Sequence, residues 1–308
     1  MSGENRDLAD LFPGFGSQFI ETGESRIFCR TGGDGPPLVL LHGYPQTHVM
    51  WHKVAPALAE RFSLVIPDLR GYGWSSLPEE AEDHETMSKR AMARDVVAVM
   101  EKLGHARFAV AGHDRGGRVA YRMALDHPGR LSKLAVLDIV PTYAQWQHMD
   151  FKLAMKVYHW PFLAQPYPLP ETLIVPSAIP YLDMTIASWT KAKSLEAFDE
   201  RALAHYRTSF NAPERVHACC EDYRAGATYD YAADSADLEA GNKIACPLLA
   251  VWGDAGIPAD GPQDIEQAPL AVWKKWAKDV IGGPADSGHF VAEENAEATL
   301  EHLTGFFG

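Results

Sequence analysis

The sequence predicts an α/β protein: a doubly wound, mostly parallel β-sheet with an inserted helical cap. Short, almost continuously apolar runs alternate with amphipathic helical stretches, which is typical of parallel strands buried on both faces. This alternation stops after residue 137 and resumes at residue 248, with only helical patterns between. The chain has 308 residues and 46% hydrophobic content, so it can bury a large core as one domain with an insertion.

The first elements are a hairpin and a strand–helix–strand unit. Residues 18–22 and 25–30 alternate in polarity around Gly23, which indicates an antiparallel edge. A buried strand at 37–41, a helix at 50–59 and a second, parallel strand at 62–68 are then expected.

Later strands and helices continue the pattern. Strand character returns at 108–111, 134–137 and 248–252. Helical patterns cover 91–103, 118–126, 270–279 and 296–307. In such sheets we expect functional residues at the carboxyl ends of the strands.

The long interruption predicts the cap. Its helical stretches cover 150–159, 180–190, 195–209 and 213–226, without a convincing buried strand. We interpret it as an insertion between two strands of one sheet. The chain would then consist of a first core segment at 1–142, a cap at 143–239 and a second core segment at 240–308.

Charge and composition exclude several partners. The formal net charge of −13 argues against nucleic acid and anionic membranes, and an anionic substrate would need a local cationic site. Residues 1–7 show no basic region leading into an apolar segment, and no window reaches about 18 apolar residues. The four cysteines have neither metal-binding nor redox spacing. We expect reduced thiols and a cytoplasmic location.

The stretch from Gly112 to Arg118 concentrates the chemistry. A strand ends at Gly112, a helical pattern begins after Gly117, and glycines on both sides of Asp114 permit the sharp turn of a nucleophile elbow. The motif is G-x-D-x-G, so a carboxylate replaces the hydroxyl of serine hydrolases and predicts an alkyl-enzyme ester. The alternative is an ordinary turn with a helix-capping aspartate.

A histidine far downstream can complete a catalytic set. His289 follows a late strand and a glycine-rich turn, which gives the chain order nucleophile, acid, histidine. Two carboxylates could orient its imidazole, because Asp138 follows the strand at 134–137 and Asp254 follows the strand at 248–252. Their positions alone do not separate them.

A loop early in the chain can supply an oxyanion hole. It follows the strand at 37–41, and the backbone N–H of Tyr44 would act together with that of Arg115. A metal site made by His42, His48 and His52 is a weak alternative, because carboxylate and cysteine ligands are absent nearby. We expect no metal and no cofactor.

Two arginines flank the elbow. Arg115 and Arg118 lie in the first helical turn, where cations oppose the helix dipole. Their guanidinium groups would fork-bind a substrate carboxylate and offset its repulsion from Asp114. The alternative is a pair of salt bridges to surface acids.

The predicted cap offers donors on apolar frames. Tyr158, His159, Trp160 and Tyr223 carry N–H or O–H groups of the kind that a departing halide requires. Each could equally be a packing residue.

Taken together, these residues resemble the fluoroacetate dehalogenases of the α/β-hydrolase superfamily, from the hairpin to the last helix. The matching segments are 42–46, 67–73, 112–118, 158–160, 221–225 and 287–290. The most specific of them are Asp-Arg-x-x-Arg at the elbow and His-Trp at 159–160.

The resemblance implies a role for each site residue. It implies Asp114 as nucleophile and His289 as base, and it favours Asp138 over Asp254 as the acid. It further implies that Arg115 and Arg118 bind the substrate carboxylate. It implies that the halide is bound by His159, Trp160 and Tyr223, and that the pocket is lined by Trp189, His113 and Tyr158. Homodimers are also typical of the family.

Two departures from the family concern the pocket rim: Tyr44 replaces the usual phenylalanine, and the loop at 253–268 is longer. The function implied is hydrolysis of haloacetates, with a 2-halo carboxylate and water as the partners. An epoxide hydrolase is the nearest alternative, with Tyr158 and Tyr223 protonating the opening oxygen. A non-catalytic protein that binds small acids is the other.

Overall fold

The computed structural model describes residues 8–308 except 80, 82 and 259–267. The N-terminal stretch 1–7 and most of the loop at 253–268, on both of which the sequence raised expectations, therefore lie outside the described residues.

The described residues form one eight-stranded sheet in the order β1-β2-β4-β3-β5-β6-β7-β8. The hairpin strands β1 and β2 are antiparallel, β2 pairs antiparallel with β4, and the remaining neighbours are parallel. The strands are β1 Gly16–Glu21, β2 Arg26–Gly32, β3 Pro37–Leu41, β4 Ser63–Pro67, β5 Phe108–His113, β6 Leu131–Leu137, β7 Leu248–Gly253 and β8 Val280–Ala285. The predicted mostly parallel sheet is confirmed.

One local prediction was wrong, and one strand was expected without bounds. The expected helix over 50–59 is two short helices, η3 His48–Trp51 and α1 Ala55–Ala59, because Pro56 starts a new helix at its first turn. Strand β8 confirms the late strand expected before His289, whose bounds the sequence did not show because Gly282, Gly283 and Pro284 interrupt its apolar pattern. It lies at the sheet edge, where such residues are tolerated.

Helices of the core pack around the sheet. Helix α3 contacts β5 and β6, and α12 contacts β7 and β8. The core helices are α2 Lys89–Lys102, α3 Asp114–Asp126, α12 Pro269–Trp276, α13 Val291–Glu294 and α14 Ala296–Phe307, with short turns η2 Ala9–Leu11 and η4 Glu85–Met87. The central strands β3 and β5 are almost completely buried, as their apolar runs predict.

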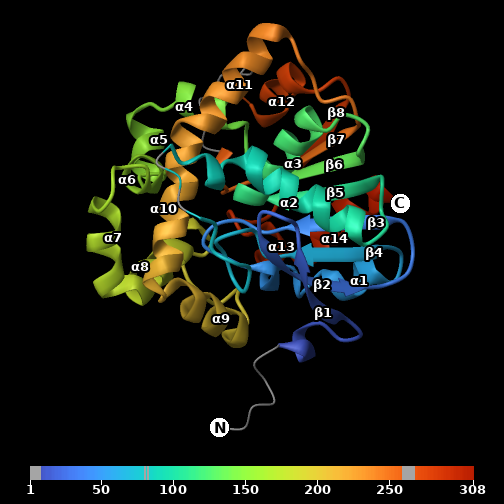
Figure 1. Cartoon of the computed structure of the whole chain (residues 1–308), viewed down its shortest axis with the longest axis horizontal. Helices are drawn as coiled ribbons and strands as arrows, with labels where there is room; N and C mark the ends of the chain where they lie inside the picture. Colours follow the sequence, from blue (N-terminus) through green and yellow to red (C-terminus); the bar gives the residue numbers. More distant parts are fainter. Residues whose placement is uncertain (1–7, 80, 82, 259–267) are drawn as a thin grey trace.

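Between β6 and β7 the chain is helical. All residues from 138 to 247 are described, and they form no strand apart from a single bridge between Ile244 and Ala277. The helices are α4 Thr142–Gln147, α5 Phe151–Lys156, α6 His159–Leu163, α7 Leu169–Ile174, η5 Val175–Ser177, α8 Ala178–Trp189, α9 Glu200–Phe210, α10 Pro213–Ala227 and α11 Tyr229–Ala240. Figure 1 shows α10 between the sheet and the outer helices α6, α7 and α8.

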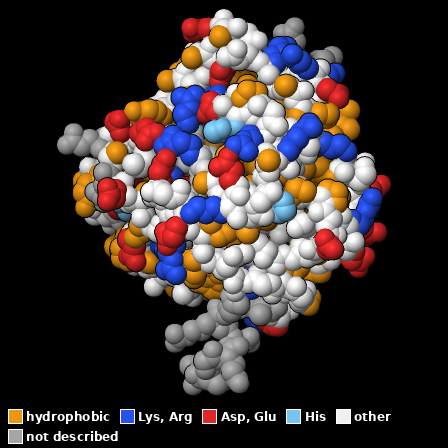
Figure 2. Space-filling model, turned by 45° about the vertical axis from the view of Figure 1, so that its right-hand side comes forward, with side chains coloured by type: hydrophobic (Ala, Val, Ile, Leu, Met, Phe, Trp, Pro, Cys, Tyr) orange, Lys and Arg blue, Asp and Glu red, His pale blue; other side chains and the backbone are white. Residues whose placement is uncertain are grey.

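The outer surface carries charges of both signs. On the face in Figure 2, acidic and basic side chains are interspersed and do not form a field of one sign. None of the described helices is long and apolar enough to cross a membrane.

Candidate active site

The turn between β5 and α3 places Asp114 at the start of the helix with φ of 46°. Glycines make this turn possible: a Cβ on Gly112 would lie 2.5 Å from the carbonyl oxygen of Gly116, and one on Gly116 would lie 2.3 Å from that of His42. The helix begins at Asp114 and not after Gly117 as predicted, because both glycines fit within its first turn. The turn has the geometry of a nucleophile elbow.

The carboxylate of Asp114 is only 4% exposed and accepts a hydrogen bond from the backbone N–H of Tyr44, with 3.1 Å between N and Oδ2. The backbone of Arg115 belongs to the first turn of α3, where N–H groups have no partner within the helix. Of the two donors predicted for the oxyanion hole, the Tyr44 N–H contacts this carboxylate, and Arg115 follows Asp114 directly in the chain. A Cβ on Gly43 would lie 2.4 Å from Cβ of Asp114, so the loop must carry glycine there.

His289 is oriented by Asp138. Its Nδ1 lies 2.6 Å from Oδ2 of Asp138, and its Nε2 lies 3.9 Å from Oδ1 of Asp114. Asp138 also accepts hydrogen bonds from the N–H groups of Gly253 and Ile257, at 2.9 and 3.0 Å. Asp254, which the residues alone left open, lies on the surface and pairs with Lys191.

The electrostatic environment keeps Asp114 ionised. Burial raises the pKa of the Asp114 carboxyl, but nearby His289, His113, Arg118 and Arg115 outweigh burial, and the pKa is below its ordinary value. An ionised carboxylate beside an imidazole is the pair that nucleophilic attack followed by water activation requires.

Arg115 is completely buried against α10. Its Nε and Nη2 donate to the carboxylate of Asp222 at 3.0 and 2.6 Å, and Nη2 also donates to the carbonyl oxygen of Asp222. The guanidinium lies over the ring of Tyr223, with Cζ 4.2 Å from the ring centroid. The sequence left open a surface salt bridge, whereas the observed partner is a buried aspartate of the helical region.

Arg118 lies one turn further along α3. Its Nη1 donates to the carbonyl oxygen of Val140 and to the hydroxyl of Thr142, at 2.8 and 3.3 Å. Its Cζ lies 4.4 Å from the centroid of a ring of Trp160. Burial, the largest influence, lowers the pKa of Arg118, a sign that this cation is costly to bury without an anion.

Aromatic side chains of the helical region close over the elbow. The ring of His159 lies 4.3 Å from that of Trp189 and is stacked at 6.2 Å on that of Tyr44, between centroids. Tyr223 stands edge-on to Tyr44 at 5.3 Å, and Trp189 stands edge-on to His289 at 5.5 Å. The structure thus brings the predicted halide-binding residues and Trp189 into one group with the base.

The protonation states of His159 and Tyr223 allow both side chains to donate hydrogen bonds. Burial lowers the pKa of His159 well below its ordinary value, so its imidazole is neutral. Burial raises the pKa of Tyr223 well above its ordinary value, so its hydroxyl keeps its proton and remains a donor.

Several polar atoms of this group are buried without a hydrogen-bond partner among the described residues. They are Nη1 of Arg115, Nε of Arg118, Nδ1 of His159, the hydroxyls of Tyr44 and Tyr223, and Nε2 of His289. Buried polar groups in proteins are normally paired, so this concentration marks a place for a small polar ligand. The two arginine nitrogens suit an anion.

The two other predicted pocket residues, His113 and Tyr158, lie beside members of this group. His113 points to the base, because its Nε2 lies 2.8 Å from the carbonyl oxygen of His289; burial lowers its pKa to about 3, so Nε2 can donate as a neutral imidazole. Tyr158 is 44% exposed and stands edge-on to His159 at 6.3 Å.

The three histidines weighed as a metal site do not act together. Nε2 of His42 accepts from the N–H of Leu69, Nδ1 of His48 pairs with Asp68, and Nδ1 of His52 donates to a backbone carbonyl. The described part of the chain holds no group of His, Cys, Asp and Glu suited to a metal ion.

Sequence reasoning missed two buried carboxylates near the site. Asp222 binds Arg115 and lies in the segment 221–225 that carries part of the resemblance, yet the sequence assigned it no role. Glu293 follows His289 by four residues and contacts Gln46 and Tyr206. Burial raises the pKa of Glu293 to about 8.

The comparisons with known proteins agree with this geometry. A family model of the alpha/beta hydrolase fold matches residues 36–296. The chain belongs to the α/β-hydrolase family. It is 44% identical over 247 residues to a fluoroacetate dehalogenase from Burkholderia sp, covering 80% of each chain. The predicted resemblance and fold are confirmed.

This α/β hydrolase is also similar to an epoxide hydrolase and to a solved structure of the same fold. A soluble epoxide hydrolase from Corynebacterium sp. (strain C12) is 32% identical over 92% of this chain and 93% of its own. The crystal structure of ALR0039, a candidate alpha/beta hydrolase from Nostoc sp PCC 7120, superimposes with a TM-score of 0.91 at 47% identity, over 96% of this chain and 99% of that one.

Proposed function

We propose that this α/β hydrolase replaces the halogen of 2-halo carboxylates by hydroxyl, with fluoroacetate converted to glycolate and fluoride. The observation that carries the proposal is a pair of buried nitrogens, Nη1 of Arg115 and Nε of Arg118, which have no hydrogen-bond partner among the described residues. They belong to the two arginines that help lower the pKa of the Asp114 nucleophile. A carboxylate bound there would bring its α-carbon next to Asp114, and the similarity to a fluoroacetate dehalogenase supports the same substrate class.

In the first step, an oxygen of Asp114 attacks the α-carbon from the side opposite the halogen. The new C–O bond forms as the C–F bond breaks, and fluoride leaves with the bonding electron pair toward His159, Trp160 and Tyr223. Donors that bind the developing fluoride more strongly than the covalent fluorine stabilise the transition state selectively. The arginines hold the substrate in the orientation needed for attack. In favourable cases, such orientation lowers the activation barrier by about 7–11 kcal/mol.

In the second step, Nε2 of His289 takes a proton from water, and the resulting hydroxide attacks the ester carbonyl of Asp114. Asp138 stabilises the imidazolium, while the N–H groups of Tyr44 and Arg115 stabilise the oxyanion. The imidazolium then protonates the leaving alkoxide, releasing the 2-hydroxy acid with inverted configuration. The product oxygen comes from Asp114, and the oxygen of water remains in the carboxylate.

An epoxide hydrolase is the second candidate, favoured by the similarity to the Corynebacterium enzyme. It would use the same Asp114, His289 and Asp138, with Tyr223 protonating the epoxide oxygen. The buried Arg115 argues against it, because a neutral epoxide offers no anion for the free Nη1.

Incubation with fluoro-, chloro- and bromoacetate, 2-fluoropropionate and styrene oxide tests the proposal, with free halide and diol as the readouts. We expect halide from the haloacetates at a rate proportional to enzyme, and none above background from Asp114→Asn. Diol without halide would instead support the epoxide hydrolase, and neither product with a bound acid would support a non-catalytic binding protein.

A further inference from the structure

Asp222 is a completely buried carboxylate that the steps above do not use. It accepts hydrogen bonds from the hydroxyl of Tyr72, at 2.6 Å, and from Nε and Nη2 of Arg115, and its Oδ1 also contacts Nζ of Lys89. Arg115 and Lys89 hold the pKa of Asp222 far below its ordinary value, against the opposing effect of burial. Nζ of Lys89 also lies 3.4 Å from Oδ2 of the buried Asp230, so two buried carboxylates face two buried cations.

This arrangement fixes the plane of the Arg115 guanidinium. Asp222 occupies Nε and Nη2, the ring of Tyr223 lies beneath the group, and a Cβ on Gly226 would approach Nη2 to 3.0 Å. Nη1 is the remaining nitrogen, and it has no partner among the described residues. Nε and Nη2 of Arg115 therefore bind within the protein, which leaves Nη1 as the nitrogen that can bind a ligand.

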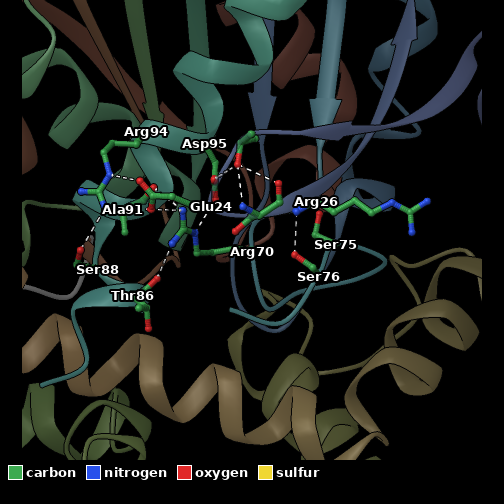
Figure 3. A network of polar contacts seen from close by, with 12 residues as sticks. Glu24, Arg26, Arg70, Ser75, Ser76, Thr86, Ser88, Ala91, Arg94 and Asp95 are labelled. Carbon is green, nitrogen blue, oxygen red and sulfur yellow. Dashed lines mark hydrogen bonds and ion pairs between the residues drawn. The ribbon is translucent and has the colours of Figure 1, made fainter. Parts of the chain in front are cut away.

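The groups around Asp222 are themselves held firmly. Arg70 donates to Asp95 and to the carbonyl oxygens of Thr86 and Ala91, so it ties the loop after β4 to the start of α2 (Figure 3). That loop carries Tyr72, and the first residue of α2 is Lys89.

The cap side of the cluster is anchored as well. The backbone N–H of Lys89 donates to Asp230 of α11 at 2.8 Å. Core and helical region thus meet at Asp222 through fixed groups.

We propose that Asp222 is a positioning residue that presents Nη1 of Arg115 to the substrate carboxylate. This rests on the proposed function. The carboxylate is then held by one nitrogen from each arginine, Nη1 of Arg115 and Nε of Arg118, in place of the bidentate fork that the sequence suggested. Asp222 sets selectivity for carboxylate substrates without touching them.

Two variants separate positioning from folding. Asp222→Asn removes one of the two anions and leaves the buried Arg115 without a paired carboxylate, which can destabilise the protein. The double variant Lys89→Met with Asp222→Asn removes one charge of each sign and keeps the cluster balanced. Glu171→Gln is the matched control, because it breaks a buried, bidentate pair with Arg224 on the same helix α10, away from Arg115.

Two measurements are made on the full-length protein. KM and kcat for fluoroacetate are determined with each variant. Dissociation constants for fluoroacetate are measured by titration calorimetry in an Asp114→Asn background, where no turnover occurs. We expect the double variant to raise KM and the dissociation constant about tenfold, with kcat and melting temperature much less affected. Glu171→Gln should change both constants less than about twofold.

The outcomes distinguish this proposal from the proposed function. If wild type releases halide and the double variant binds fluoroacetate as well as wild type does, the role of Asp222 is overturned. If wild type releases no halide but binds the acid in an Asp222-dependent manner, the function fails and the positioning role stands. Equal loss of kcat, affinity and melting temperature in the double variant, or no binding by wild type, also overturns the proposal.

Discussion

Nδ1 of His289 lies 2.6 Å from Oδ2 of Asp138. This contact fixes the tautomer, so that Nδ1 carries the proton and Nε2 faces the nucleophile with a free lone pair. Such a base is needed only for the second of the two proposed steps, because the displacement of halide involves no proton. The two steps can therefore be separated by substitution.

Replacing His289 should trap the intermediate. In His289→Gln, Asp114 can still displace fluoride, but water is no longer activated, so turnover should fall roughly 10³-fold or more. We expect a burst of about one fluoride per active site and a protein mass increased by one carboxymethyl group. Intact-protein mass spectrometry checks this, with Asp114→Asn as the control that shows neither signal. Undiminished turnover would remove His289 from the mechanism.

The hydroxyl of Tyr223 should matter most for the poorest leaving group. Fluoride concentrates charge and accepts strong hydrogen bonds, so Tyr223→Phe should lower kcat for fluoroacetate about 10²-fold, the usual effect of losing one such donor. Bromoacetate, with a better leaving group, should lose less than about tenfold. Fluoride and bromide release under saturating substrate give the comparison. An equal loss for both acids would indicate a packing role.

Gly43→Ala should inactivate the enzyme without unfolding it. The added Cβ would lie 2.4 Å from Cβ of Asp114, so the nucleophile or the Tyr44 N–H must shift. Because a misplacement of about 1 Å can cost about 10²-fold in rate, we expect a kcat reduced on that scale. Circular dichroism should show wild-type secondary structure. Gly104→Ala is a poor control because of its positive φ, whereas Gly305→Ala meets open space in α14 and should retain full activity.

Glu293 predicts a pH dependence of stability. Burial raises its pKa to about 8, so between roughly pH 4.5 and pH 8 the unfolded chain loses this proton while the folded chain keeps it. Unfolding then releases a proton, and stability contributed by Glu293 falls as pH rises through this window. The variant Glu293→Gln lacks the effect, so its melting temperature relative to wild type should rise from pH 5 to pH 8.

The control is the exposed Glu60→Gln, whose melting temperature relative to wild type should stay constant over the same range. A constant difference for Glu293→Gln as well would mean that Glu293 ionises alike in both states.

The elements of the site were predictable where backbone geometry limits the sequence. The glycines around Asp114 are required by contacts shorter than a Cβ allows, so they leave a recognisable motif. Asp138 and Asp254 were not separable from the residues, because each follows a neighbouring parallel strand. The structure directs only Asp138 to His289, through a residue with φ of 54° and two backbone donors.

What the sequence could not predict depends on side-chain partners. Strand β8 has no apolar run, since an edge position does not demand one. Asp222 is one of 41 acidic residues, and its partners Lys89, Tyr72 and Arg115 are distant in the chain, so only the fold brings them together. Assembly as a homodimer and a cytoplasmic location stay predictions.

Arg115 stacks on the ring of Tyr223, with Cζ 4.2 Å from the ring centroid, so the two side chains are held in a fixed relation to one another. Helix α10 supplies both this ring and Asp222, the anchor of the guanidinium. Under the proposed function, the arginine side receives the carboxylate and the hydroxyl of Tyr223 receives the halide, so one helix positions both groups. We therefore expect acids with the halogen on the carbon next to the carboxylate to react faster than 3-fluoropropionate, which is one carbon longer.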